Sequence, residues 1–475
     1  MNLELRKIVS NNLQKAVIKN IMVLLINPKT SKPTELNTRY FREPNNGLLN
    51  IAAILDIHEI NVDLLDLEQY LELNENQREK RVIKEVKGHK IIGITCLTNT
   101  FHKARKIAKQ IKDVYPKKYI VIGGPHVSFL YDTILKKDYQ ARNLIDFICV
   151  GEAEYSFLQL VNVLLKNATK EELSSQMQAK IQKIQGIAYT NSLGKVIYTG
   201  KIGDTIDLNE LPLPARYKLV PTNYYYTVAN VIVNRGCPNQ CSFCSRQELF
   251  KSTRIRSIKS IIAELRDIES SQMYEFVNFY DNINLQKGFL KELVAGIQKE
   301  DFSLPWGCEL RVDNLTAQEA RLMKQAGCRV IATGIESASE KVLKRNFKYQ
   351  DPQKVKRGLG YLKENDISIQ AYFVLGLPGE TQETFSTTLD YIDTLPLRED
   401  DTINYFIATP YPGSKLWKDR EDFGINIFEH DFSKYDCEHL IFETKDLIKD
   451  QLKEMYRRAK EVENSYQRKE PISIK

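Results

Sequence analysis

Short apolar runs alternate with amphipathic stretches through the first third of the 475-residue chain. The runs have the length of buried strands and cover residues 21–26, 62–67, 91–96, 119–123 and 147–150. Between them, apolar residues recur at helical spacing, as at Ala104, Ile107 and Ile111. Continuous apolar strands separated by helices are typical of a parallel sheet covered on both faces. The pattern predicts an α/β domain with a doubly wound sheet over residues 21–165, after a lead-in helix over residues 1–20.

A second series of strand and helix signals fills the later part of the chain. Its strands are expected at residues 228–233, 275–280, 306–310, 329–333, 369–375 and 403–407. Six strand–helix units are too few to close an eight-fold barrel. Residues 166–226 read as a linking helix, a hairpin at 186–200 and an extended proline-rich connector. Residues 416–475 read as a helical region and a tail.

Composition excludes several classes of protein. The net charge of +7 is modest for this length, and no arginine-rich block marks a nucleic-acid binder. No apolar run approaches the roughly 18 residues that a membrane span needs. The eight cysteines are scattered and do not resemble a disulfide framework. We therefore expect a cytoplasmic protein without a membrane span or a nucleic-acid partner.

Three of the cysteines gather in one loop, at Cys237, Cys241 and Cys244, directly after an apolar strand. In parallel α/β folds, the loop at a strand's carboxyl end is where ligands bind. Three thiolates can hold iron or zinc. A structural zinc needs a fourth ligand, but the next cysteine is Cys308 and no histidine lies between. Three ligands on a four-iron cluster leave one iron open. The alternative is three thiols that pack as small apolar groups.

This spacing, with Phe243 just before the third cysteine, resembles the radical S-adenosylmethionine (radical SAM) superfamily. The resemblance implies that Cys237, Cys241 and Cys244 hold a [4Fe-4S] cluster whose open iron binds S-adenosylmethionine. One electron then cleaves the sulfonium to a 5′-deoxyadenosyl radical, which abstracts hydrogen from a small-molecule substrate. Phe243 matches the aromatic position near the adenine. The resemblance also implies a partial (β/α)6 barrel over residues 227–415 and a reducing partner such as flavodoxin or ferredoxin.

Polar groups follow the other expected strands of this barrel. By resemblance, Asp281 would bond the methionine amino group and Glu336 the ribose, and Arg311 could pair with the methionine carboxylate. Gly376 and Pro378 lie in a glycine-rich turn suited to close contact with the adenine. Asp281 and Glu336 could instead cap the next helix, and Glu380 is expected to be such a cap.

The loops after the third, fourth and fifth strands of the first domain carry glycine and hydroxyl groups in order. Together they look like the cobalamin-binding domain that precedes many radical SAM enzymes, and the resemblance then covers roughly residues 20–415. The residues that would line the cobalamin site are Thr98, Asn99, Gly123, Gly124, His126, Gly151 and Glu152.

One departure concerns the lower face of the cobalt. Many cobalamin domains supply a histidine ligand in an Asp-x-His-x-x-Gly loop, and Asp56-Ile57-His58 fits only in part because Asn61 replaces the glycine. We expect His58 to be a partly exposed helix histidine and the cobalt to have no protein histidine ligand. His126 would lie near the corrin, or it is a turn residue bonded to backbone.

Four functions fit these patterns. The first is a cobalamin-dependent methyltransferase that acts on an unactivated carbon of a small molecule or natural product. The second keeps both cofactors but performs oxidative ring closure or rearrangement, as in cyclases that look similar. A methylthiotransferase would need three more N-terminal cysteines, and only Cys96 and Cys149 are present. A corrin-binding protein with a silent barrel is disfavoured by the intact cysteine triad.

Overall fold

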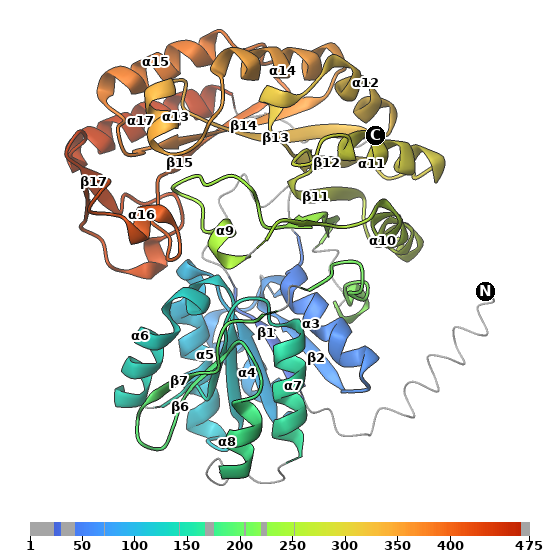
Figure 1. The fold of residues 1–475 in the computed structure, drawn as a ribbon, viewed down its shortest axis with the longest axis vertical. Helices are drawn as coiled ribbons and strands as arrows, with labels where there is room; N and C mark the ends of the chain where they lie inside the picture. The colour runs from blue at the N-terminus through green and yellow to red at the C-terminus, as the bar shows by residue number, and fades with distance from the viewer. Residues whose placement is uncertain are drawn as a thin grey trace. The chain divides into compact units, whose positions relative to one another are not determined.

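The computed structural model describes residues 23–29, 43–70, 72–141, 143–166, 175–203, 206–219, 226–250 and 252–466 (Figure 1). The lead-in helix predicted for residues 1–20 lies outside the described residues, as does the end of the predicted tail. The described residues form two compact units. The first contains residues 23–29, 47–203 and 211–219, and the second contains residues 43–46, 206–210 and 226–466.

The first unit is built on a sheet with the strand order β2-β1-β3-β4-β5-β6-β7. Its parallel strands are β1 (Val23–Asn27), β2 (Val62–Asp66), β3 (Ile91–Thr95), β4 (Tyr119–Gly123) and β5 (Phe147–Cys149). The predicted hairpin forms β6 (Ile187–Thr190) and β7 (Val196–Tyr198) and extends this sheet antiparallel to β5. The five strands expected from the apolar runs are therefore confirmed.

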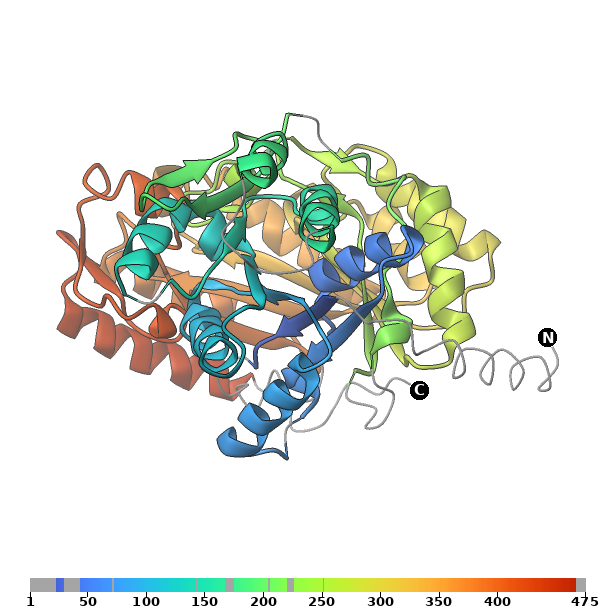
Figure 2. The same cartoon turned by 90° about the horizontal axis from the view of Figure 1, so that it is seen from below.

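Helices cover both faces of this sheet, as Figures 1 and 2 show. One apolar layer lies under α3 (Asn46–Ile57), α7 (Glu154–Leu165) and α8 (Ser175–Ile181). The other lies under α4 (Glu75–Val86), α5 (Phe101–Val114) and α6 (Pro125–Ala141). Along β1, Val23 and Leu25 join the first layer and Leu24 and Ile26 the second, because successive strand side chains point to opposite faces. The predicted doubly wound architecture is confirmed.

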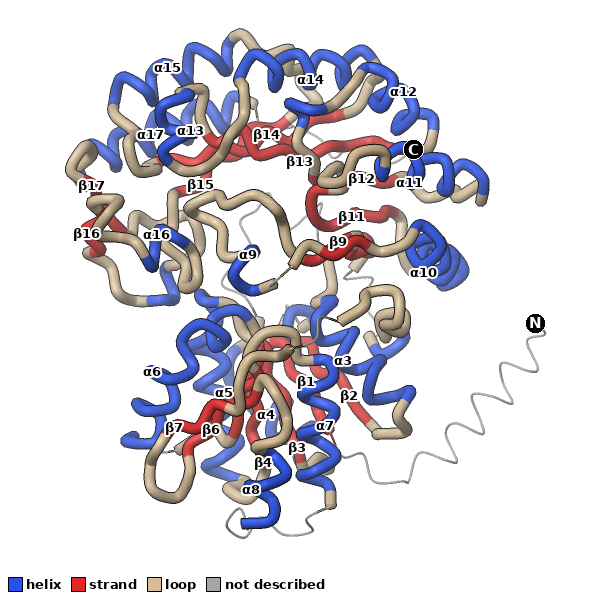
Figure 3. Tube along the Cα trace, in the orientation of Figure 1, coloured by secondary structure: helices blue, strands red, loops and turns tan. Residues whose placement is uncertain are grey.

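The second unit contains a six-stranded, wholly parallel sheet with the order β15-β14-β13-β12-β11-β8. Its strands are β8 (Val228–Ile232), β11 (Phe276–Asn282), β12 (Trp306–Glu309), β13 (Cys328–Glu336), β14 (Ser368–Leu375) and β15 (Thr402–Ile407). Within the described residues β8 and β15 do not pair with each other, so the barrel is open, as predicted. Figure 3 shows the helices along one side of these strands. They are α10 (Ile258–Ser271), α11 (Phe289–Lys299), α12 (Ala317–Gln325), α13 (Glu340–Arg345), α14 (Pro352–Glu364) and α15 (Gln382–Asp393).

The two faces of this sheet differ in polarity. On β14, Ile369, Ala371 and Phe373 are fully buried, whereas Gln370 and Tyr372 are partly exposed on the opposite face. We call that opposite face the inner face. It begins with an apolar cluster of Val228, Phe276 and Val330 and becomes polar toward the carboxyl ends of the strands. Its polar residues include Asn278, Tyr280, Glu309, Gln370 and Tyr372.

Eleven short elements and the long helix α17 complete the described chain. They are η1 (Leu67–Gln69), η2 (Thr98–Thr100), η3 (Arg216–Lys218), β9 (Asn234–Arg235), α9 (Arg246–Leu249), β10 (Arg254–Ile255), η5 (Val312–Asn314), α16 (Lys415–Lys418), β16 (Ile425–Ile427), η6 (Phe432–Lys434), β17 (Phe442–Thr444) and α17 (Lys449–Ser465). The Glu463 carboxylate of α17 accepts a hydrogen bond from the Tyr405 amide of the edge strand β15 at 2.9 Å. None of the described helices is both long and apolar enough to cross a membrane.

A buried carboxyl group closes the turn after β14. The Glu380 side chain accepts a hydrogen bond from the Gly376 amide at 2.6 Å, and burial raises the pKa of Glu380 to about 8. The expectation that Glu380 caps the next helix is wrong. Thr381 caps α15 instead, because its hydroxyl reaches the Thr384 amide.

Another buried carboxylate fixes the opposite end of the sheet. Asp401, which is fully buried, accepts hydrogen bonds from the Lys363 ammonium and from the amides of Ile369 and Arg398, each at 2.7 Å. Lys363 also reaches the half-exposed Asp400 at 3.3 Å. Asp401 thus joins α14, β14 and the start of β15.

The Asp401→Ala variant should lose about 3–5 kcal/mol of unfolding free energy, because a buried ammonium and two amides lose their acceptor. Asp400→Ala is the matched control and should lose only about 1 kcal/mol, since Asp400 is half-exposed, the Lys363 ammonium keeps Asp401 as its acceptor, and only the Ser368 hydroxyl loses its bond to a carboxylate. Urea unfolding of the full-length protein measures both. Equal losses in the two variants would contradict this role of Asp401.

Glu380→Gln should flatten the dependence of stability on pH. The folded-state pKa of Glu380 lies above its unfolded value, so the folded protein holds a proton that the unfolded chain has lost between about pH 5 and pH 8. Stability therefore falls as pH rises through that window, by at most roughly 4–5 kcal/mol from this group. Thermal unfolding at pH 5.5 and pH 8.5 should show the variant matching the native protein at low pH and exceeding it at high pH. Parallel curves would refute this.

Candidate functional site

The cysteine loop leaves the carboxyl end of β8 and is shaped by its backbone. β9 pairs antiparallel with β10, and Gly236 between β9 and the first cysteine has φ +82. A Cβ at Gly236 would overlap the Ser252 carbonyl, so only glycine fits this close approach. The Cys244 amide then donates to the Cys241 carbonyl at 3.1 Å, which makes a tight turn. Cys237 and Cys241 are partly exposed, Cys244 is exposed, and none forms a disulfide.

The charges around these thiols favour a bound cation. Burial raises the pKa of Cys241 to about 11, the Lys348 ammonium opposes that rise, and Glu336 and the other two thiolates add to it. Burial also raises the pKa of Cys244. Within the described residues, no three His, Cys, Asp or Glu side chains are grouped so that they could hold a single metal ion. Three thiols in one short loop are a donor set that fits an iron–sulfur cluster.

Glu336 ends β13 beside this loop, as predicted from the strand pattern, in a left-handed backbone conformation with φ +63. Its carboxylate folds back over Gly334, where a Cβ would collide with it. The Lys348 ammonium pairs with it at 2.9 Å, and both side chains are buried. Ser339, not Glu336, caps the following helix α13. The pair places one carboxylate and one ammonium next to Cys241.

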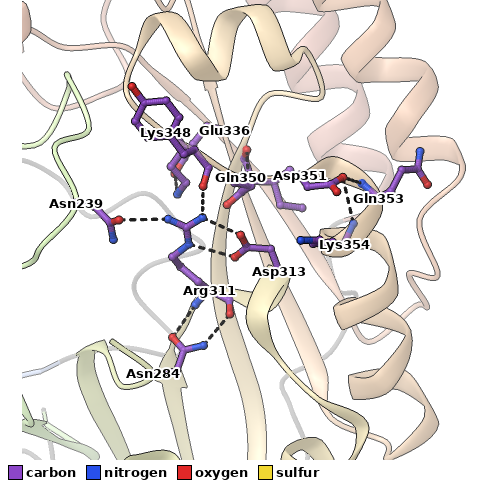
Figure 4. Close-up of polar contacts among 12 residues, drawn as sticks. Asn239, Asn284, Arg311, Asp313, Glu336, Lys348, Gln350, Asp351, Gln353 and Lys354 are labelled. Carbon is purple, nitrogen blue, oxygen red and sulfur yellow. Dashed lines mark hydrogen bonds and ion pairs between the residues drawn. The ribbon is translucent and has the colours of Figure 1, made fainter. Parts of the chain in front are cut away.

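Arg311 follows β12 and reaches the cysteine loop. Its guanidinium pairs with both Asp313 oxygens, at 2.7 and 3.1 Å, and donates to the Asn239 side chain at 3.4 Å (Figure 4). Burial alone would lower the pKa of Arg311, but hydrogen bonding and the charge of Asp313 raise it. Asn284 fixes the backbone of Arg311 through two hydrogen bonds, at 2.7 and 3.1 Å. The methionine carboxylate, which the sequence predicts as a partner of Arg311, would have to share this guanidinium with Asp313.

The remaining predicted residues of the second unit lie at the same edge of the sheet. Gly376, with φ +83, and Pro378 form the turn after β14. Phe243 is partly buried and packs on the apolar cluster that contains Leu377 and Leu416. Asp281 lies near the carboxyl end of β11, but its side chain is outside what the structure describes.

Sequence reasoning missed a set of residues on the inner face. Asn278 donates to the Glu43 carboxylate at 2.6 Å, and burial, followed by the nearby Glu309, raises the pKa of Glu43 to about 7. Burial likewise raises the pKa of Tyr280 to about 12, although its side chain keeps 46% of its surface. Alternation along the strands could have identified Tyr280 and Glu309 as inward-facing. Nothing in the pattern points to Glu43, which precedes α3.

In the first unit, the predicted loops meet at the carboxyl edge of the sheet. The Ser128 hydroxyl donates to the Gly124 carbonyl at 2.8 Å and accepts from the Gly151 amide at 3.0 Å. Gly124 has φ +114, and a Cβ there would overlap the Cys96 carbonyl. Gly123 ends β4 and its carbonyl accepts from the Cys96 amide. Thr98 and Asn99 form η2, and the partly exposed Glu152 follows Gly151.

The two histidines considered from sequence, His58 and His126, lie in different surroundings. His126 belongs to the first turn of α6, where it is buried with its ring centroid 4.6 Å from that of Phe101. Burial lowers the pKa of His126 to about 4, so the imidazole is neutral at pH 7. It therefore lies in a helix rather than in the turn considered from sequence. His58 is exposed after α3, and its Nδ1 lies 2.8 Å from the Ile54 carbonyl, as expected for a helix-end histidine.

Comparison with protein families assigns both units. Residues 231–392 match the family model described as the radical SAM superfamily. Residues 36–161 match the model described as the B12 binding domain. The radical SAM match lies within the second unit and includes the cysteine loop. The B12 match lies within the first unit except for residues 36–46, and it includes the loops around Gly124 and Gly151.

Relatives and solved structures extend this likeness over most of the chain. An uncharacterized methyltransferase of Pyrococcus horikoshii is 29% identical over 334 residues, covering 69% of this chain and 68% of its own. An anaerobic magnesium-protoporphyrin IX monomethyl ester cyclase of Rubrivivax gelatinosus is 30% identical over 359 residues. The aligned region spans 73% of this chain and 60% of the cyclase. The structure of the radical S-adenosylmethionine methyltransferase TsrM from Kitasatospora setae has a TM-score of 0.70 at 14% identity, covering 95% and 89%.

Cofactor assignment follows from the family and fits the residues present. The thiol loop offers three ligands, and the loops of the first unit offer the glycine-lined edge that a flat ligand can approach. The chain therefore carries a radical SAM domain and a B12-binding domain, with a [4Fe-4S] cluster, S-adenosylmethionine and cobalamin as cofactors.

Proposed function

We propose that this enzyme methylates an unactivated carbon of a small-molecule substrate. The observation that carries the proposal is the Cys237–Cys244 loop with its three free cysteines, which would leave one iron of a four-iron cluster open. Methyltransferases among the relatives support it, including a bacteriochlorophyllide d C-12(1)-methyltransferase of Chlorobaculum tepidum, 24% identical over 440 residues. The aligned region spans 91% of this chain and 85% of that relative.

When bound, the cluster supplies the electron that cleaves S-adenosylmethionine, and cobalamin supplies a carrier for the methyl group. The chain's own residues bind and orient. Cys237, Cys241 and Cys244 hold the cluster, and Lys348 keeps a positive charge beside Cys241. Glu336 accepts hydrogen bonds from the ribose, oriented by its ion pair with Lys348. Arg311 attracts the methionine carboxylate, and Asp281 accepts from the amino group.

The substrate would face the inner side of the open barrel. Tyr280, Tyr372 and Glu309 lie on that face near the carboxyl ends of their strands, where ligands bind in parallel α/β folds. The charges of Glu309 and Cys244 both help to raise the pKa of Tyr280, so Tyr280 lies on the part of the inner face toward the cysteine loop. A reducing partner such as flavodoxin or ferredoxin would deliver the electron.

In the first unit, we propose that the glycine-lined edge approaches the corrin. Thr98, Asn99 and Glu152 would supply hydrogen bonds, and Gly123, Gly124 and Gly151 would allow close backbone contact. His126 would act as part of the packed wall behind this edge, because its ring lies buried on Phe101. No histidine is assigned to the cobalt.

Oxidative ring closure is the second candidate function. It is favoured by the cyclase of Rubrivivax gelatinosus, a second relative with similar identity. The two reactions differ in the fate of the methyl group, since a cyclase removes two hydrogens from its substrate and adds no carbon. The choice can therefore be tested without knowing the substrate.

The test follows the methyl group of trideuteromethyl-labelled S-adenosylmethionine in anaerobically reconstituted enzyme with reduced cobalamin. A methyltransferase should place the label on the corrinoid, detected by mass spectrometry of the extracted cofactor, and should also release 5′-deoxyadenosine. Release of 5′-deoxyadenosine with no label on the corrinoid would contradict methyl transfer and favour the cyclase.

Cys244→Ala should lower bound iron to near the background and reduce formation of 5′-deoxyadenosine at least about 100-fold, because the cluster loses one of three ligands. Cys328→Ala is the control, since this cysteine is buried in β13 away from the loop. It should retain iron and activity. Iron that persists in the Cys244 variant would refute the ligand assignment.

A further inference from the structure

Asn346 follows α13 and is completely buried. Its side-chain nitrogen donates to two carbonyl oxygens, those of Val342 and Pro378, each at 2.9 Å. Its side-chain oxygen accepts from the Ser242 hydroxyl at 2.7 Å. Both ends of one amide therefore connect three segments that are far apart in the sequence.

Ser242 is the contact point of the cysteine loop. It lies between Cys241 and Cys244 and is itself completely buried, whereas those two thiols remain at least partly open. Its amide donates to the Asn346 carbonyl at 2.9 Å, and its carbonyl accepts from the Leu416 amide at 2.9 Å. Ser242 is thus a fully buried anchor of the loop, next to cysteines that are at least partly exposed.

Pro378 is the contact point of the turn after β14, which the proposed function places against the adenine. Apolar packing reinforces this connection, because Phe243 and Leu377 belong to the same cluster. The internal hydrogen bond between Glu380 and Gly376 makes the turn itself rigid. Asn346 consequently joins two rigid parts, the loop that holds the iron and the turn that would hold the nucleoside.

Resting on the proposed function, we propose that Asn346 is a positioning residue that sets the separation between the cysteine loop and the Gly376–Glu380 turn. S-adenosylmethionine must contact both at once, with its adenine on the turn and its amino acid group at the open iron. An error of about 1 Å in such a geometry can cost up to about 100-fold in rate. Supporting residues that lock functional groups in place therefore matter even when they touch no ligand.

The test compares Asn346→Ala and Asn346→Asp with Asn365→Ala. Asn365 is a matched control because it also ends a helix and donates its side-chain nitrogen to the carbonyl four residues earlier, Tyr361, at 2.8 Å. Among the described residues, Asn365 forms no hydrogen bond to the cysteine loop or to the turn. Asn346→Asp keeps the acceptor for Ser242 but loses the amide donor to Pro378.

The main readout is the electron paramagnetic resonance spectrum of the reduced cluster, titrated with S-adenosylmethionine. Both Asn346 variants should keep their iron, since the backbone bond to Ser242 remains, and should need at least about tenfold more S-adenosylmethionine for half the spectral change. Asn365→Ala should stay within about twofold of the native enzyme. Native half-saturation in the Asn346 variants, or an equal loss in Asn365→Ala, would overturn the assignment.

A second readout needs no cofactor. Hydrogen exchange of the iron-free protein should quicken in residues 240–246 and 376–380 together in Asn346→Ala, and in neither segment in Asn365→Ala. Faster exchange in the cysteine loop alone would show that Asn346 holds only that loop. Loss of bound iron in both Asn346 variants would show the same. Either result contradicts the coupling.

Failure of the proposed function looks different. A native enzyme whose cluster spectrum ignores S-adenosylmethionine would count against the proposed function. A native enzyme that responds, with Asn346 variants that respond equally, would count only against the positioning role.

Discussion

Burial of the Cys241 thiol in one short loop with two further cysteines is the constraint around which the candidate site of the second unit is arranged. Burial, together with the charges of Glu336 and the other two thiols, raises the pKa of Cys241, and the buried Lys348 ammonium opposes that rise. A cluster bound at this loop would add further positive charge beside Cys241. Metal affinity and local folding are therefore linked at this loop. Gly236 and Ser242 hold the backbone so that the thiols stay together.

The parallel sheet explains why the charged groups converge. Every strand of such a sheet ends at the same edge, so Glu336, Arg311 and the Gly376 turn reach the cysteine loop although they are distant in sequence. Alternation along each strand then separates two tasks. One face packs on helices and provides stability, while the inner face retains polar groups such as Tyr280 and Glu309. The first unit packs helices on both faces of its sheet, which leaves the strand ends as the place where we propose ligand contact.

Much of this organisation could be predicted from sequence, because strands and cysteine spacing are local signals. The apolar runs gave all eleven expected strands, and the spacing of Cys237, Cys241 and Cys244 indicated the cofactor class. Contacts that join distant segments could not be predicted. Ser242 and Asn346 are 104 residues apart, and Lys348 pairs with a residue on another element. The prediction that Glu380 caps the next helix is wrong, because Thr381, one residue later, caps α15 with its hydroxyl. His126 was placed on a loop, but α6 starts at Pro125 and buries it.

The central claim is that one iron of a thiolate-held cluster is open to S-adenosylmethionine. Electron–nuclear double resonance on the reduced enzyme tests this most directly, with S-adenosylmethionine carrying ¹⁵N in its amino group and ¹⁷O in its carboxylate. The account predicts strong hyperfine coupling of both labels to the cluster in the native enzyme. A reduced cluster that cleaves S-adenosylmethionine but shows neither coupling would contradict it.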